Sequence, residues 1–158
     1  MAELRSFLYT PAIHKEKDGY LLSDNFTLLQ EAVIHHYLSV ESYWAKDIPL
    51  ATVQSMIAGS LCLGIYQDEE QVAFARMVTD GTTFGYLADV FVLEGHRKKG
   101  LSKWMIGALR SHPTLQGLRR WLLVTHDAHS LYEQFGFRPI SDVDHFLTIH
   151  DPELYIKE

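Results

Sequence analysis

The sequence has 158 residues, 47% of them hydrophobic, which is typical of one globular domain with a hydrophobic core. Its formal net charge of −6 argues against general affinity for nucleic acids. No apolar run reaches the ~18 residues that span a membrane, and the N-terminus lacks the apolar stretch of a secretory signal. The single cysteine, Cys62, excludes an internal disulfide, and its apolar neighbours predict a core residue. We expect a cytoplasmic protein that forms one domain over residues 1–158.

The first third of the chain predicts one strand and two helices, although the first twenty residues give no clear pattern. Tyr20–Thr27 indicates a strand that runs into a helix start, with Asn25 or Thr27 as the cap. Apolar residues at helical spacing predict a helix over 28–38. Pro49 and Gly59 favour the start and the end of a second helix over 50–58.

Three antiparallel strands are expected next. Ser60–Gln67 and Val72–Val78 are apolar runs, and the polar turn Asp68–Glu70 between them predicts a hairpin. Asp80 and Gly81 indicate another turn, after which Phe84–Leu93 predicts the third strand.

The second half alternates helices and strands. Residues 101–111 have their apolar side chains on one stripe and predict a helix that ends at His112-Pro113. Trp121–Thr125 predicts a buried strand, Ala128–Phe135 a short helix closed by Gly136, and Phe137 and Phe146–Ile149 the final strands. The fold class is therefore α/β, with a mixed sheet flanked by helices.

A basic turn stands between the third strand and the helix over 101–111. The first N–H groups of a helix have no partner within it, and the helix dipole favours a negative ligand there. Arg97, Lys98, Lys99 and Lys103 surround this helix start in an otherwise acidic protein, which predicts a site for a phosphate. The alternative is a solvated helix start whose basic residues bind no ligand.

Two common phosphate motifs are missing from the sequence. It has no Gly-x-x-x-x-Gly-Lys-Ser/Thr, which excludes a P-loop, and no Gly-x-Gly-x-x-Gly after a first strand, which leaves a dinucleotide site unsupported. In the turn itself, Gly100 lets a pyrophosphate approach the backbone closely, and Ser102 offers a hydrogen-bond donor.

The segment Arg97-Lys98-Lys99-Gly100-Leu101-Ser102 resembles the Arg/Gln-x-x-Gly-x-Gly/Ala signature of the GNAT N-acetyltransferase superfamily. A second segment, Asp127–Phe137, resembles the downstream motif of that family, in which an Ala, a Leu-Tyr pair and a Gly-Phe pair recur. The resemblance extends from about Cys62 to Pro139. One departure is Ser102, where the family usually has Gly or Ala, and we expect a tighter or hydrogen-bonded pyrophosphate contact there.

The resemblance implies the GNAT fold, a central, mostly antiparallel sheet flanked by helices, and transfer of an acetyl group from acetyl-CoA to an amine by direct attack. It also implies which residues hold the cofactor. Backbone groups of the third predicted strand would pair with pantetheine, and these belong to Val90, Phe91 and Val92. The residues of the turn would meet the pyrophosphate, and these are His96, Arg97, Lys98, Lys99, Gly100, Leu101, Ser102 and Lys103.

Three residues are candidates for the catalytic chemistry. Tyr132 matches the family's Leu-Tyr position, which implies an acid that protonates the departing thiolate, although a core tyrosine is the alternative. Asp89 lies in an apolar strand, where a carboxylate needs a partner or a role. The sequence leaves three interpretations of Asp89 open: it takes a proton from the amine, it binds a cationic substrate, or it pairs with Arg76. His126 follows a strand and is a second candidate base or a structural residue.

The acceptor pocket in this fold usually involves the loop between the first two helices, here residues 39–49. Tyr43 and Trp44 offer aromatic surface to a cationic amine, and together with Asp89 they are the candidate substrate residues. Alternatively, these aromatic side chains pack on the core. The histidines do not form a metal-binding set, so we expect no metal.

Two other functions remain open at the level of sequence. One is a CoA-binding or CoA-sensing module without catalysis, and the other is a partner-binding domain whose basic turn contacts an acidic protein surface. For an enzyme we expect a small-molecule or peptide amine as acceptor, a possible homodimer, and no nucleic-acid or membrane partner.

Overall fold

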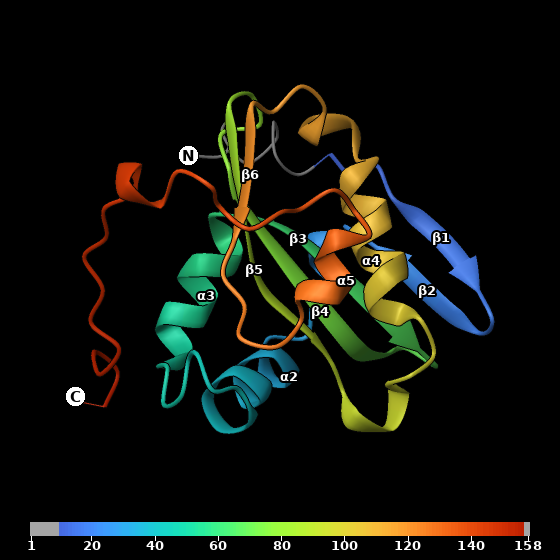
Figure 1. Ribbon diagram of the computed structural model, residues 1–158. Helices are drawn as coiled ribbons and strands as arrows, with labels where there is room; N and C mark the ends of the chain where they lie inside the picture. The colour runs from blue at the N-terminus through green and yellow to red at the C-terminus, as the bar shows by residue number, and fades with distance from the viewer. Residues whose placement is uncertain (1–9, 157–158) are drawn as a thin grey trace.

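The computed structural model describes residues 10–156 and contains one six-stranded sheet (Figure 1). The strands follow each other across the sheet in chain order: β1 (His14–Lys17), β2 (Tyr20–Ser23), β3 (Leu61–Gln67), β4 (Glu70–Thr79), β5 (Phe84–Val92) and β6 (Arg120–Leu123). Neighbouring strands are antiparallel, except that β5 and β6 run parallel. The mixed sheet flanked by helices confirms the expected fold class.

The helices lie on both faces of this sheet. Between β2 and β3 the chain forms α2 (Glu31–His36), a π-helical turn (Tyr37–Glu41) and α3 (Leu50–Ala58). Between β5 and β6 it forms α4 (Leu101–Arg110), and after β6 it forms α5 (His129–Glu133). Figure 1 shows α4 and α5 together in front of the sheet. The helix predicted over 28–38 is present but shifted, since α2 and the π-helical turn together cover residues 31–41, and the helix predicted over 128–135 is present but shorter.

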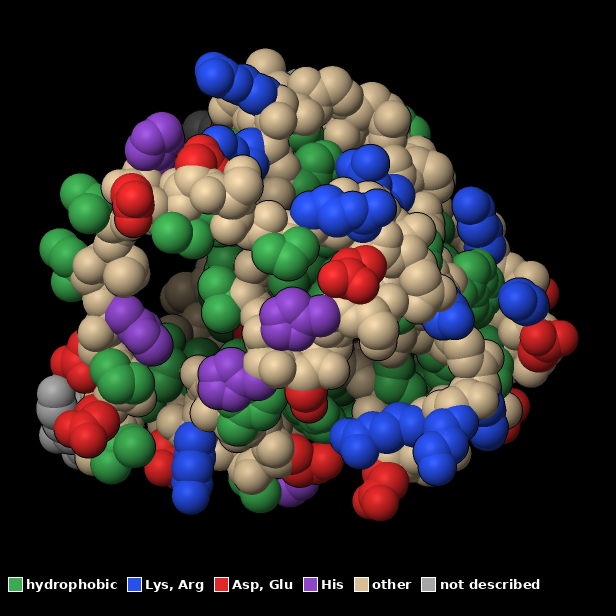
Figure 2. Space-filling view, viewed as in Figure 1, with side chains coloured by type: hydrophobic (Ala, Val, Ile, Leu, Met, Phe, Trp, Pro, Cys, Tyr) green, Lys and Arg blue, Asp and Glu red, His purple; other side chains and the backbone are tan. Residues whose placement is uncertain are grey.

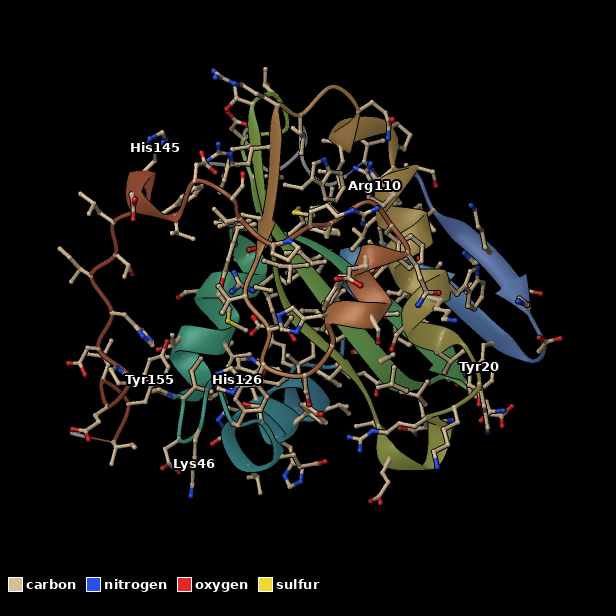
Figure 3. The ribbon with its side chains drawn as sticks, viewed as in Figure 1. Tyr20, Lys46, Arg110, His126, His145 and Tyr155 are labelled. Carbon is tan, nitrogen blue, oxygen red and sulfur yellow. The ribbon has the colours of Figure 1, made fainter. Side chains whose placement is uncertain are left out.

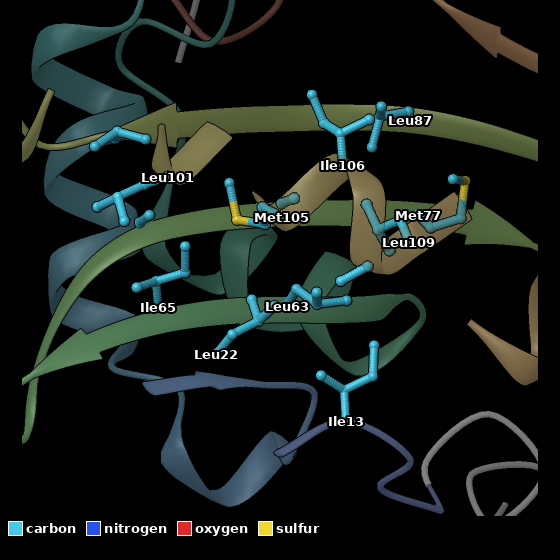
Figure 4. Close-up of a cluster of buried hydrophobic side chains, with 14 of the residues drawn as sticks. Ile13, Leu22, Leu63, Ile65, Met77, Leu87, Leu101, Met105, Ile106 and Leu109 are labelled. Atoms are coloured by element: carbon cyan, nitrogen blue, oxygen red, sulfur yellow. The ribbon is translucent and has the colours of Figure 1, made fainter. Parts of the chain in front are cut away.

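Strand alternation gives each face of the sheet its own core. On the α4 face, Met105, Ile106 and Leu109 are fully buried against side chains of β3, β4 and β5 (Figure 4). On the other face, Ile34 and Ile57 belong to a second cluster, which also includes Cys62, Phe74 and Phe91. The prediction of Cys62 as a core residue is confirmed, since only 3% of it is exposed. Burial raises the pKa of its thiol to about 12.

The hairpins form where the sequence predicts turns. Asp68 and Glu69 adopt positive φ angles of 49° and 70° between β3 and β4, which is the geometry of a tight two-residue hairpin turn. At the next turn, the Asp80 carboxylate accepts hydrogen bonds from the backbone N–H groups of Thr82 and Thr83. The Thr83 hydroxyl donates to the same carboxylate, and this hydrogen bond, together with the two backbone ones, holds the pKa of Asp80 well below its usual value.

The final strands predicted at Phe137 and Phe146–Ile149 are not found. After α5 the chain crosses β6 and continues as an arm, residues 140–156, that contains one short 3-10 turn and no strand (Figure 1). A strand requires a neighbour with which to exchange backbone hydrogen bonds. Within the described residues, no backbone hydrogen bond joins this arm to β6. The prediction of a buried strand over Trp121–Thr125 also differs, because β6 is an edge strand and only half-buried.

Candidate functional site

The central irregularity of the sheet is a β-bulge in β5. Phe91 pairs with Phe74 and Ala88 pairs with Arg76, so that two residues of β5, Asp89 and Val90, lie opposite one residue of β4. Asp89 adopts a φ of 54°, in the left-handed region that aspartate tolerates better than most residues. A bulge bends its strand and redirects side chains, so it places Asp89 differently from a regular strand residue.

Beyond the bulge, β5 has a free edge. The parallel pairing of β5 with β6 runs from Phe84 opposite Arg120 to Leu87 opposite Leu123 and ends there. Within the described residues, the remaining part of β5, residues 88–92, is paired only with β4. Its backbone groups on the β6 side are therefore available to an extended ligand that binds as an additional strand, except that the Val92 carbonyl already accepts a hydrogen bond from Arg97 Nε.

The bulge presents Asp89 to two partners. The Arg76 Nε donates to Asp89 Oδ2 at 2.7 Å, and the Trp44 indole Nε1 donates to Oδ1 at 2.9 Å. Arg76 also donates from Nη1 to the Ser60 hydroxyl at 3.1 Å. The Asp89 side chain is 7% exposed and that of Arg76 15%, so this is a largely buried ion pair. Of the roles that the sequence left open for Asp89, the structure contains the pairing with Arg76.

An aromatic wall joins Asp89 to the end of β6. The Trp44 ring meets the Tyr43 ring edge to face at 4.9 Å between centroids, and Tyr43 stacks on the His126 imidazole at 4.7 Å. The backbone N–H of His126 also donates to the Tyr43 hydroxyl at 3.3 Å. Tyr43 and Trp44 are 55% and 41% exposed, so neither is packed into the core. The structure thus brings together four of the predicted site residues.

Tyr132 lies near this wall but is buried. It is the buried residue of α5, 8% exposed, and its ring packs edge to face against Phe137. Burial, reinforced by the nearby Tyr43 phenol and the Asp127 carboxylate, raises the pKa of Tyr132 to about 12. The phenol therefore keeps its proton throughout the physiological range, so that it can donate a hydrogen bond or act as an acid there.

The basic turn forms the N-terminus of α4. Lys98 and Gly100 adopt φ angles of 62° and 76°, and Gly100 is the N-cap, with no side chain capping the helix. The first helical hydrogen bond runs from the N–H of Trp104 to the carbonyl of Gly100, so the preceding N–H groups of α4 have no partner within the helix. This arrangement fits the anion site that the sequence predicted.

The side chains of the turn differ in their roles. Arg97 donates from Nε to the Val92 carbonyl at 3.0 Å and from Nη2 to the Tyr37 hydroxyl at 3.3 Å, which fixes the turn to the end of β5. Lys99 donates to the Tyr20 hydroxyl at 3.1 Å, and the same hydroxyl lies 2.9 Å from His96 Nδ1. Lys98 and Lys103 are exposed. Tyr20 and Tyr37, far away in the sequence, carry no sequence signal for this position.

The turn and the aromatic wall lie at separate places around β5. Figure 3 shows Tyr20 and His126 on opposite sides of the lower part of the molecule. A cavity of about 340 Å³ opens beside the turn and is lined by Tyr20, Lys99 and Gly100. A larger cavity of about 860 Å³ lies along the β1–β2 hairpin, and the predicted catalytic residues line neither one. The arrangement is thus an elongated surface, with anion donors at one end and titratable and aromatic side chains at the other.

Over residues 10–156, no group of three or more His, Cys, Asp and Glu side chains is placed to hold a metal ion. No helix in the same range combines the length and apolarity needed to cross a bilayer.

Comparison with known proteins adds independent findings. The model of the acetyltransferase (GNAT) domain family matches residues 58–139, nearly the range of the resemblance found in the sequence. A candidate acetyltransferase of Gibberella zeae is 34% identical over 151 residues, with 81% of this chain and 84% of that protein covered.

Two solved structures are also similar to this chain. A candidate GNAT-family acetyltransferase of Xanthomonas campestris pv. campestris is 47% identical, covers 89% of this chain and 99% of its own, and superposes with a TM-score of 0.86. Glucosamine-6-phosphate N-acetyltransferase of Arabidopsis thaliana superposes with a TM-score of 0.60 over 84% of this chain and 97% of its own. At 13% identity, that second match concerns the fold alone.

Proposed function

Because the chain belongs to the GNAT acetyltransferase family, we propose that it transfers an acetyl group from acetyl-CoA to a primary amine. The observation that carries this proposal is that the unpaired edge of β5 is followed in the chain by the basic turn and the uncapped N-terminus of α4. A long ligand that carries both amide groups and a pyrophosphate matches these two features. When bound, acetyl-CoA supplies a thioester whose acyl carbon is open to attack by an amine.

Binding falls to the turn and the strand. The free N–H groups of Leu101, Ser102 and Lys103 would bind the pyrophosphate, with Lys98 and Lys103 adding positive charge. Residues 90–92 on the free β5 edge would bind the pantetheine amides as a strand does. Arg97 would act indirectly, since its guanidinium holds the turn against Val92 and Tyr37.

Proton transfer falls to the other end of the surface. His126 is exposed and oriented by its stacking on Tyr43, and an imidazole is well suited to accept a proton from an ammonium group near neutral pH. Tyr132 would donate a hydrogen bond to the departing thiolate, which its raised pKa allows because the phenol stays protonated. Asp89 has both oxygens engaged, so we assign it to orienting Trp44 and to neutralising Arg76.

Binding and chemistry can be tested separately. Acetyl-CoA at 100 times its Kd should stabilise the fold by about 2.7 kcal/mol, which corresponds to a rise in Tm of roughly 5–10 °C for a chain of this size. If millimolar acetyl-CoA leaves Tm unchanged, the proposal is wrong. Release of free thiol in the presence of a panel of primary amines then tests turnover.

The variant Tyr132→Phe tests the donor. Loss of a hydrogen bond to a charged group costs about 1.5–3 kcal/mol, so kcat should fall roughly 10- to 100-fold. The KM for acetyl-CoA should change less than about twofold, because ground-state binding does not use the phenol. Tyr155→Phe, which removes a half-buried phenol on the arm at residues 140–156, is the matched control and should keep its kcat. An unchanged kcat in Tyr132→Phe would remove Tyr132 from the mechanism.

A further inference from the structure

A buried tyrosine of β2 contacts the basic turn that precedes α4. Tyr20, the first residue of β2, is 5% exposed, and its hydroxyl lies 3.1 Å from Lys99 Nζ and 2.9 Å from His96 Nδ1. Figure 3 shows Tyr20 at this end of the molecule, beside the start of α4. Buried hydroxyls need hydrogen-bond partners, and these two partners of Tyr20 both belong to the turn.

The chemistry of the three groups sets the direction of the two hydrogen bonds. An ammonium group has donors only, so the Tyr20 oxygen accepts from Lys99. The phenol has one proton of its own to donate, and the unprotonated Nδ1 of His96 is the acceptor within its reach. A neutral imidazole with a bare Nδ1 carries its proton on Nε2. The hydroxyl of Tyr20 therefore links two residues of the turn, one as donor and one as acceptor.

These two residues lie on either side of a strained one. His96 ends a short 3-10 turn, and Lys99 directly precedes the N-cap of α4. Between them, Lys98 has a φ of 62°, in the left-handed region that is unfavourable for a lysine. Such a conformation persists only when the surrounding contacts hold it. The Tyr20 hydroxyl joins the chain before and after Lys98, so it is well placed to hold this conformation.

The turn is fixed from both faces of the sheet. Tyr20 belongs to the core cluster on the α4 face, whereas the Tyr37 hydroxyl, which accepts a hydrogen bond from Arg97, belongs to the cluster on the other face. Figure 2 shows Lys and Arg side chains gathered over this turn. Like charges repel, so a conformation that gathers Arg97, Lys98 and Lys99 needs contacts that maintain it before an anion binds.

The β1–β2 hairpin determines the position of Tyr20. Asp18 and Gly19 have φ angles of 51° and 81°, the geometry of a tight two-residue hairpin turn, and Tyr20 follows them opposite Lys17. All four residues of β1 are exposed, so this strand adds no buried side chain to the core. Its pairing with β2 instead fixes the end of β2 that carries the Tyr20 hydroxyl to the start of α4.

We propose that Tyr20 is a positioning residue, which holds the turn in the conformation where the first N–H groups of α4 bind the pyrophosphate. This inference rests on the proposed function, since it takes acetyl-CoA as the ligand of the turn. Tyr20 acts through His96 and Lys99, because its hydroxyl is engaged by both. A preformed turn lowers the entropic cost of binding, so loss of the hydroxyl weakens the binding of ligands that carry a pyrophosphate.

Two ligands separate this role from a general loss of structure, because CoA carries the pyrophosphate and pantetheine ends before it. Tyr20→Phe keeps the ring and its edge-to-face contact with the His96 imidazole. The variant should raise the Kd of CoA about tenfold in calorimetry, the order expected for one lost hydrogen bond to a charged group. The Kd of pantetheine, from an NMR titration of the signals of residues 90–92, should change less than about twofold. A parallel loss for both ligands would overturn the proposal, since it would report general damage.

The matched control is Tyr66→Phe. It removes a buried phenol hydroxyl from the neighbouring strand β3 that has no hydrogen-bond partner in the described residues, so the Kd of CoA should be unchanged. If the wild-type protein does not bind CoA, the proposed function itself fails. If the wild type binds CoA and Tyr20→Phe binds it equally well, this inference alone fails.

The hydrogen bonds can also be tested without any ligand. In ¹⁵N NMR at about pH 8, His96 should show a bare, hydrogen-bonded Nδ1 and a protonated Nε2. In Tyr20→Phe the signature of the accepted hydrogen bond at Nδ1 should disappear. A protonated Nδ1 in the wild type, or an Nδ1 signal that Tyr20→Phe leaves unchanged, would overturn the proposed linkage.

Discussion

The ion pair between Asp89 and Arg76 allows the strongest quantitative prediction. The two side chains are largely buried and their charged atoms are 2.7 Å apart. Removing one partner of a buried pair typically costs about 3–5 kcal/mol, because the remaining charge is left without compensation. In Asp89→Ala the Arg76 guanidinium keeps its hydrogen bond to the uncharged Ser60 hydroxyl, and Trp44 loses its acceptor. We therefore expect a loss of about 3–4 kcal/mol in the free energy of unfolding.

A double-mutant cycle separates the charge from the packing. When Arg76→Met accompanies Asp89→Ala, no buried charge remains, and the cost should fall to about 1–2 kcal/mol, since apolar replacement of a buried pair is often nearly neutral. The double variant should thus be about 2 kcal/mol more stable than Asp89→Ala, and Arg76→Met alone, which leaves the Asp89 carboxylate buried without its partner, completes the cycle. Asp144→Ala, an exposed acid on the arm, is the control and should change stability by less than about 0.5 kcal/mol.

Urea unfolding followed by circular dichroism measures these values, and equal m-values would show that the same cooperative unit unfolds in each variant. A loss below about 1 kcal/mol in Asp89→Ala would refute the assignment, because the carboxylate would then not compensate Arg76. The assignment would also fail if the double variant were no more stable than Asp89→Ala.

Two further predictions concern groups outside the candidate site. The Tyr66 hydroxyl is buried without a hydrogen-bond partner in the described residues, so Tyr66→Phe should raise stability by about 1 kcal/mol and Tm by roughly 2–4 °C in a thermal melt, whereas a fall in Tm would indicate an ordered water or another partner. Burial alone would raise the pKa of Asp24, but hydrogen bonds from His112, Ala12 and Ile13 outweigh it and lower the pKa below the usual 3.8. Because the folded-state pKa is the lower one, this group stabilises the fold above about pH 4 and loses its contribution as the pH falls through the folded value; Asp24→Asn should flatten that part of the stability–pH profile, and an unchanged profile would contradict the prediction.

The sequence alone predicted the structural features that depend on residues close together in the chain. The α4 helix, the β3–β4 hairpin and the basic turn each follow from local spacing and turn residues, and the structure contains all three. Asp89 was noticeable because a carboxylate in an apolar strand needs a reason. The bulge that explains its position was not predictable, because it depends on the register between β4 and β5.

The parts that sequence missed all require contacts between distant segments. Tyr20 reaches the turn only because β2 and the start of α4 are brought together, across a separation of 76 residues between Tyr20 and His96. The strand expected at Phe146–Ile149 has the right composition, but a strand also needs a partner, which one copy of the chain does not provide within its described residues. Composition therefore predicts a tendency to pair, and the fold decides whether a pair is made.

Two structural requirements explain why residue 89 is an aspartate, so a loss of activity in an Asp89 variant is not by itself evidence of a catalytic role. A φ of 54° favours Gly, Asn or Asp over other residues, and the buried Arg76 requires a negative charge. Asp is the one residue that meets both conditions. Asp89→Asn keeps the backbone preference and the acceptor for Trp44 while removing the charge. A loss of kcat in this variant would point to proton transfer only if the free energy of unfolding were retained; otherwise it reports damage to the bulge that both the fold and the site require.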